Sequence, residues 1–95
     1  MECAQVSYSR HALERMFARA IRPEQVRSVL LDGVTVEVYP DDKPYPSSLL
    51  VGRIGETWLH VVAAYDREAR HCIVVTAYVP DPRTWDETFR RRRQL

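Results

Sequence analysis

Polar side chains that can transfer protons recur along three segments in which every second residue is apolar. Alternate residues of a strand point to opposite faces of a sheet, so the apolar positions predict a core face and the polar positions a second face. The candidates on that second face are Glu37, Tyr39, His60, Thr76 and Tyr78. We therefore expect His60 to point outward and the five side chains to gather on one surface.

A second polar row follows helical spacing. His11, Arg15 and Arg19 are each four residues apart, which places them along one face of a helix. Ser9 is a suitable N-cap for that helix, and its opposite stripe is apolar, with Ala12, Leu13, Met16, Phe17 and Ala20. One rigid element thus offers two cations and an imidazole.

These residue types fit the cleavage of RNA without a metal ion, in which the 2′-hydroxyl attacks the neighbouring phosphorus. That reaction needs a base, an acid for the 5′-oxygen and a cation beside the crowded phosphate. Histidine suits both proton roles near neutral pH. We expect His60, assisted by Glu37, to act as base or acid, His11 to be the second such group, and Tyr78 to orient or donate.

Substrate binding is expected from arginines and aromatic rings, because guanidinium groups match phosphate oxygens and rings stack on splayed bases. Arg15 and Arg19 are expected to hold the reacting phosphate. Further RNA contacts are expected from Arg19, Tyr39, Thr76, Arg90 and Arg91. Each residue also has a structural explanation, since a lone histidine is more often a hydrogen-bonded structural group and Glu37 could pair with a surface arginine.

The elements that must position these groups fit a single α+β domain over residues 1–95, with its core at about 7–92. Two helices come first, the second starting at Pro23 and stopping at Gly33. Four strands follow at 34–39, 49–54, 57–65 and 71–79, and Gly55-Glu56 fits a two-residue hairpin turn. Because the connections are short, we expect a four-stranded antiparallel meander. Asp81 and Pro82 predict a C-terminal helix, docked by Trp85 and Phe89.

Composition narrows the classes of function. The net charge of +1 excludes binding of nucleic acid through bulk charge, although 14 cations are present and Lys43 is the only lysine. Phosphate-binding glycine loops, His-Glu-x-x-His and Gly-x-Ser-x-Gly are all missing from the sequence, and no metal site or cofactor is expected. Cys3 and Cys72 lack metal-ligand spacing and are not expected to form a disulfide. With neither a leader-like nor a membrane-spanning pattern, a cytoplasmic location is expected.

Several motifs together resemble a known family. They are Ser9-x-His11-Ala12-x-x-Arg15-Met16 with Arg19, Glu37-x-Tyr39-Pro40, Pro44-Tyr45-Pro46-Ser47, His60-Val61-Val62, and Thr76-x-Tyr78-x-Pro80-Asp81-Pro82 with Trp85. This combination resembles domain-of-unknown-function family 4258, over about residues 7–92. The resemblance implies a fold similar to RelE-like, BrnT-like and MqsR-like toxins of the barnase/RelE nuclease superfamily. It also implies a partner antitoxin with a zinc finger, similar to MqsA.

The sequence therefore predicts a metal-independent endoribonuclease toxin of a type II toxin–antitoxin pair. Its expected partners are RNA, the zinc-finger antitoxin and the ribosome, with no membrane. Two alternatives stay open. One is a non-catalytic RNA- or protein-binding module of the same fold, and the other is a housekeeping or phage-defence accessory protein with a protein partner.

Overall fold

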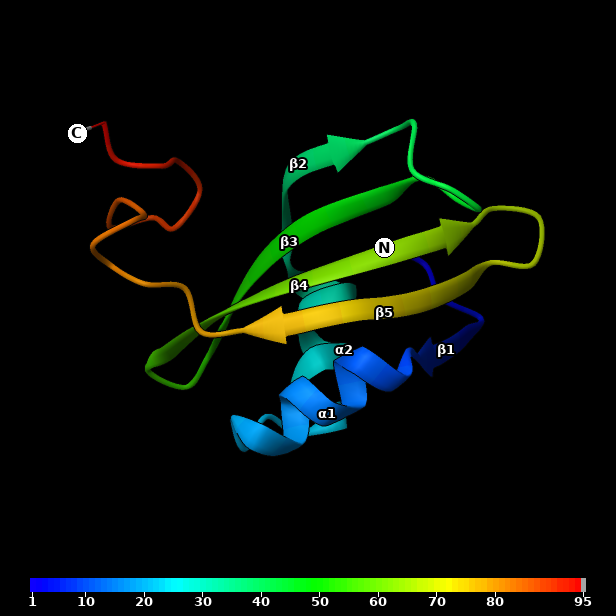
Figure 1. The fold of residues 1–95 in the computed structure, drawn as a ribbon, viewed down its shortest axis with the longest axis horizontal. Coiled ribbons are helices and arrows are strands. Elements are labelled where there is room, and N and C mark those ends of the chain that lie inside the picture. The colour runs from blue at the N-terminus through cyan, green and yellow to red at the C-terminus, as the bar shows by residue number, and fades with distance from the viewer. Residues whose placement is uncertain (95) are drawn as a thin grey trace.

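A five-stranded sheet carries two helices on one face in the computed structural model, which describes residues 1–94 (Figure 1). The strand order is β1-β5-β4-β3-β2. The elements in chain order are β1 (Gln5–Tyr8), α1 (Arg10–Ala18), α2 (Pro23–Asp32), β2 (Val34–Tyr39), β3 (Ser47–Ile54), β4 (Thr57–Asp66) and β5 (His71–Tyr78).

Local signals set most of these boundaries. The Ser9 side chain accepts a hydrogen bond from the Ala12 amide at 3.0 Å and so caps α1. Pro23 opens α2, where its missing N–H costs nothing. Gly55 adopts a φ of 62° between β3 and β4, and this left-handed conformation favours glycine in a two-residue hairpin.

The predicted four-stranded antiparallel meander is wrong, because the sheet gains a fifth strand. Strands β2 to β5 do pair in antiparallel order, but β1 pairs in parallel with β5 and places Gln5 opposite His71. The sequence of β1 carries little strand signal, since only Val6 and Tyr8 are apolar or aromatic in its four residues. The open edge of β5, a long-range feature, provides the partner that makes this segment a strand.

The predicted C-terminal helix is also wrong. Residues 81–94, hereafter the C-terminal segment, contain turns and a single bridge between Trp85 and Arg92. The Asp86 carboxylate accepts hydrogen bonds from the amide and hydroxyl of Thr88, and such local bonds compete with a helix. Phe89 has a φ of 57°, which ends any right-handed helix.

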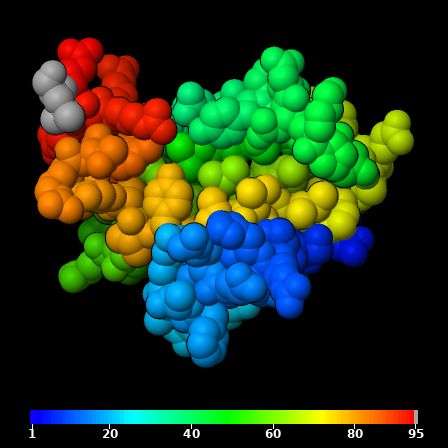
Figure 2. Space-filling view, viewed as in Figure 1, coloured from blue at the N-terminus to red at the C-terminus, as the bar shows by residue number. Residues whose placement is uncertain are grey.

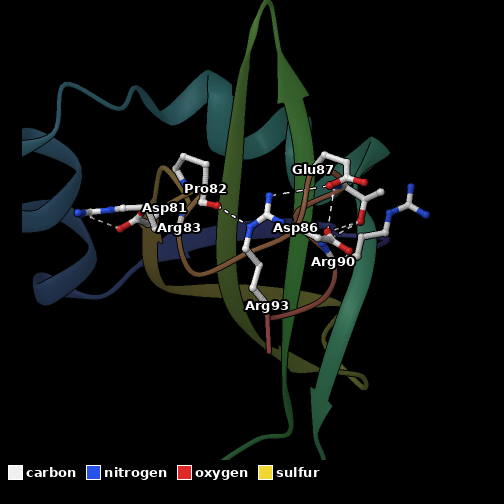
Figure 3. Close-up of polar contacts among 8 residues, drawn as sticks. Asp81, Pro82, Arg83, Asp86, Glu87, Arg90 and Arg93 are labelled. Carbon is white, nitrogen blue, oxygen red and sulfur yellow. Dashed lines mark hydrogen bonds and ion pairs between the residues drawn. The ribbon is translucent and has the colours of Figure 1, made fainter. Parts of the chain in front are cut away.

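Polar contacts within the C-terminal segment hold it together (Figure 3). The Arg93 guanidinium donates to the Pro82 carbonyl at 2.8 Å and lies 3.9 Å from the Glu87 carboxylate. Asp81 pairs with Arg83 at 3.1 Å. The segment therefore forms a tied loop that lies on the side of the sheet away from the helices (Figure 1).

The main core lies between the helices and the sheet. The helices contribute Met16, Val26, Val29 and Leu30, and the connection between them contributes Ile21. The sheet contributes Leu50, Leu59, Val61, Ala63, Cys72, Val74 and Ala77. Close approach of α2 to β3 depends on Gly52, where a Cβ would lie 2.9 Å from a methyl group of Val29. Burial of this apolar face fixes which face of the sheet stays available for other contacts.

Cys3 and Cys72 form a disulfide, which contradicts the expectation from the sequence. Their Cα atoms lie 5.6 Å apart although 69 residues separate them in the chain. The pairing of β1 with β5 brings the two cysteines together. The Ala4 amide donates to the Arg70 carbonyl, and Gln5 then pairs with His71, the first residue of β5. The prediction failed because it did not include β1. Cys72 itself is fully buried.

Candidate active site

Strand register gathers the five strand candidates on the sheet face opposite the helices. Val51, His60 and Tyr78 are directly paired across β3, β4 and β5. The next row of directly paired residues, two positions along each strand, contains Glu37, Leu49, Val62 and Thr76. A third row begins with Tyr39 on β2. Since directly paired residues point to the same face, β2 and β5 supply polar side chains while Leu49 and Val62 lie between them.

This face is hollowed in the space-filling view. Figure 2 shows yellow-green atoms of β4 recessed between the green of β2 and the yellow of β5, with the orange and red C-terminal segment at one end. Glu37 is exposed, and Tyr39, Thr76 and Tyr78 are half-buried. The hollow is therefore lined by hydroxyl and carboxylate groups that solvent can reach.

His60 does not point into solvent, and this corrects the sequence-based expectation. Its exposed fraction is 0%. One ring nitrogen, Nε2, lies 2.8 Å from the Phe89 carbonyl oxygen, and the other, Nδ1, lies 3.1 Å from the Tyr78 hydroxyl. Because a carbonyl oxygen only accepts, Nε2 carries the proton and Nδ1 accepts from Tyr78. Burial lowers the pKa of His60, which agrees with a neutral ring.

The C-terminal segment is the cover that buries His60. The Trp85 ring contacts His60 edge-on, with centroids 4.7 Å apart, and is itself buried. Phe89 lies against Trp58 with ring centroids 5.8 Å apart. Trp85 and Phe89 do pack on the sheet, although they come from a loop. The sequence pattern gave the outward face of β4 correctly but could not reveal this loop above it.

Two tyrosines face the hollow from opposite walls. The Tyr39 hydroxyl donates to a Glu37 carboxylate oxygen at 3.0 Å, and the Tyr78 hydroxyl donates to His60. Burial is the main cause that raises the pKa of both tyrosines, and for Tyr39 the hydrogen bond to Glu37 adds to it. Both phenols therefore keep their protons at neutral pH and are oriented by a fixed acceptor.

Arg92 is the functional candidate that the sequence analysis missed. Its guanidinium lies over the Trp85 ring, 5.1 Å from the centroid. Burial raises the pKa of Tyr39 and of Tyr78, and the positive charge of Arg92 opposes that rise. For His60, burial lowers the pKa and the charge of Arg92 lowers it further. One cation thus acts on both walls of the hollow. The run of four arginines gave a signal, but only the bridge between Trp85 and Arg92 singles out this member.

The row on α1 reaches the site only at its C-terminal end. Arg19 donates to the Ala77 carbonyl at 2.8 Å and, with Tyr78 and Trp85, lines a second hollow of about 420 Å³. Its charge also lowers the pKa of Tyr78. Arg15 and His11 lie one and two turns back along α1, both exposed, and within residues 1–94 neither side chain makes a hydrogen bond or ion pair.

The remaining residues predicted to contact RNA are Thr76, Arg90 and Arg91, which lie at the edge of the hollow. Thr76 is half-buried on β5 in the same row as Glu37. Arg90 and Arg91 are exposed, and no side-chain hydrogen bond or ion pair engages them in the part of the chain that the structure describes. They are thus free cations close to Phe89, at the end of the hollow.

No three His, Cys, Asp or Glu side chains within residues 1–94 lie close enough together to hold a metal ion. The same residues contain no helix with the length and apolarity needed to cross a membrane.

The sequence model of the family described as Domain of unknown function (DUF4258) matches residues 8–79. The chain belongs to this family. The match spans α1 to β5 and includes every predicted site residue except Arg90 and Arg91. It ends before the C-terminal segment, so Trp85 and Arg92 lie outside the matched region. No curated protein and no solved structure matches this chain.

Proposed function

We propose that this DUF4258 protein is an endoribonuclease that cleaves single-stranded RNA through attack of the 2′-hydroxyl, without a metal ion. The observation that carries the proposal is the convergence of Tyr39, Tyr78 and Arg92 on one hollow, where each phenol donates a hydrogen bond to a neighbouring side chain and Arg92 acts on both. A proton acceptor, a proton donor and a cation are the parts that this reaction requires.

In the proposed reaction, Tyr39 with Glu37 accepts one proton and Tyr78 donates the other. The Tyr39 oxygen takes the 2′-hydroxyl proton while its own proton passes to Glu37, and the 2′-oxygen forms a bond to phosphorus. The bond from phosphorus to the 5′-oxygen then breaks, and Tyr78 donates its proton to that oxygen. Arg92 and Arg19 stabilise the negative charge on the phosphate and on the Tyr78 phenolate. The products are a 2′,3′-cyclic phosphate and a 5′-hydroxyl.

His60 then acts as a positioning residue. It is buried, and both ring nitrogens are already bonded, so it orients Tyr78 and does not touch RNA in this arrangement. His11 and Arg15 contact the flanking RNA backbone, since they continue the row from Arg19 along α1. Thr76, Arg90 and Arg91 supply further contacts along the strand.

A pair of matched tyrosine variants tests the proposal. We expect Tyr78→Phe to reduce cleavage of a single-stranded RNA by about 100-fold or more in excess chelator, because a general acid contributes on that scale. Tyr45→Phe, in the connection between β2 and β3, loses a hydroxyl elsewhere and keeps wild-type rates. Equal rates for wild type and Tyr78→Phe would remove the proposed acid from the reaction.

The biological role proposed for this activity is that of a toxin acting on mRNA, at the ribosome, in the cytoplasm. It rests on the resemblance to RelE-like, BrnT-like and MqsR-like toxins, which also suggests an antitoxin with a zinc finger similar to MqsA. Induced expression should stop growth, and co-expression of a neighbouring zinc-finger gene should restore it. Growth arrest that also occurs with Tyr78→Phe would argue against RNA cleavage as its cause.

A second candidate is a non-catalytic RNA-binding module of the same fold. The burial of His60 favours this candidate, because both ring nitrogens of the residue best suited to proton transfer already have hydrogen-bond partners within the protein. Under this alternative the wild-type protein binds single-stranded RNA but leaves it intact, and Tyr78→Phe changes neither property.

A further inference from the structure

The contacts of Phe89 differ from those of an ordinary packed residue. Its ring lies against Trp58 with centroids 5.8 Å apart and planes tilted by 39°, and its carbonyl oxygen accepts the Nε2 proton of His60 at 2.8 Å. The Trp58 ring, hereafter the platform, thus contacts a planar ring, while the His60 N–H binds a carbonyl oxygen of the same residue. A nucleobase offers the same two features, because it stacks on aromatic side chains while its edge accepts hydrogen bonds.

Charge around this platform also suits a nucleic acid. The Arg53 guanidinium lies over the Trp58 ring, 5.8 Å from its centroid, and Arg92 lies over Trp85. Arg90 and Arg91 follow Phe89 directly and are exposed. An aromatic peptide would fit the rings alone, whereas one guanidinium over each of the two indoles and two exposed arginines next to Phe89 match a stacked base with its phosphates.

The backbone at Phe89 holds the ring in place at a cost. Its φ of 57° lies in the left-handed region, which is unusual for a bulky residue and costs on the order of 1 kcal/mol or more. Such a conformation persists only where surrounding contacts enforce it. Here the Phe89 amide donates to the Asp86 carbonyl at 3.0 Å, and this local turn holds the conformation together with the contacts to Trp58 and His60.

We propose that Trp58 and His60 form a binding site for one unpaired base of a single-stranded nucleic acid, and that Phe89 occupies this site within the same chain. The turn at Phe89 is then displaceable while Trp85 and Arg92 keep their places, and a bound strand replaces the Phe89 ring and carbonyl with a base. This inference names the substrate contact of the proposed nuclease and rests on that function, but base binding can be measured without cleavage.

The two phenylalanines of the chain provide a matched test. Phe89→Ala removes the competing ring, and Phe17→Ala removes a ring that is 90% exposed on α1. The probe is a labelled DNA hexamer, which lacks the 2′-hydroxyl and cannot be cleaved by the proposed chemistry. We expect Phe89→Ala to bind it about tenfold more tightly than wild type, since stacking on one base is worth that much or more. Phe17→Ala should bind as wild type does.

A double variant tests whether the tighter binding of the hexamer depends on Trp58. Trp58→Leu combined with Phe89→Ala should return the affinity to the wild-type value or below, with folding checked by circular dichroism. Unchanged affinity in Phe89→Ala, or a gain that survives loss of Trp58, would overturn the base site. If the gain appears but wild-type protein cleaves no RNA, the base site stands and the proposed nuclease fails. An aromatic peptide that competes for the site as well as the hexamer would also contradict a base site.

Discussion

The Tyr78 hydroxyl and Nδ1 of His60 lie 3.1 Å apart, with the tyrosine donating to a buried and neutral imidazole. The same ring donates from Nε2 to the Phe89 carbonyl, so one histidine links β5 to the C-terminal segment. This relationship gives His60 a structural role beneath the hollow and leaves Tyr78 as the group presented to substrate.

Replacing His60 by alanine should therefore destabilise the protein. The change leaves a cavity and removes partners from the Tyr78 hydroxyl and the Phe89 carbonyl, and such losses cost about 2–4 kcal/mol. Urea denaturation followed by circular dichroism measures the free energy of unfolding. His11→Ala, at an exposed position on α1, is the control and should change it by less than about 0.5 kcal/mol. An equally stable His60→Ala protein would contradict the buried network.

The lowered pKa of His60 also predicts how stability depends on pH. In the folded protein this ring binds a proton less readily than in the unfolded chain, so the unfolded state gains protons first as the pH falls. The stabilising contribution is complete above the unfolded pKa of about 6.5 and is lost as the pH falls below it. The free energy of unfolding should decline between about pH 6.5 and 5, and His60→Gln should flatten this decline. An identical slope in His60→Gln would assign the decline to other groups.

The sequence predicted the candidate site better than it predicted its surroundings. Alternation along β2, β4 and β5 was sufficient to put Glu37, His60 and Tyr78 on one face, because strand periodicity is a local property. The C-terminal segment could not be predicted in this way. Its loop depends on Asp86 bonding to Thr88 and on contacts with Trp58 and His60, far away in the sequence.

The same limit explains the missed strand and disulfide. Residues 5 to 8 alternate polar and apolar or aromatic side chains, but four residues are too few to predict a strand, and the parallel pairing with β5 makes β1 one. Cys3 and Cys72 meet because of that pairing. Arg92 was missed for a similar reason, since its neighbours in the arginine run have the same chemistry and only the tertiary structure separates them.

Arg92 and Arg91 offer a charge-preserving comparison. Arg92→Lys should reduce cleavage by about tenfold or more, because a lysine cannot keep the planar contact with Trp85 or a bidentate contact with phosphate. Arg91→Lys, whose side chain is exposed, should lower the rate by no more than about twofold. Single-turnover rates at saturating RNA separate the chemical step from binding. Equal losses in both variants would mean that the arginines act only through their summed charge.

The disulfide predicts a redox-dependent stability. Cys3→Ser should lower the free energy of unfolding by up to about 4 kcal/mol, because the bond closes a long loop across 69 residues. Wild type in reductant should match it, and Cys3→Ser should not respond to reductant. Cys72 lies six positions before Tyr78 on β5, roughly 20 Å along the strand, so cleavage below the melting temperature should be unaffected. A wild-type protein whose stability is the same with and without reductant would show that the bond is not formed in solution.

The most direct test of the proposed nuclease uses an RNA in which one ribose at a mapped cleavage position is replaced by 2′-deoxyribose. In excess chelator, the account predicts that wild-type protein cuts the unmodified strand to a 2′,3′-cyclic phosphate and a 5′-hydroxyl. It predicts no cut at the deoxy position and unchanged cutting elsewhere. Cleavage at the deoxy linkage, or cleavage that requires added magnesium or manganese, would contradict attack by the 2′-hydroxyl.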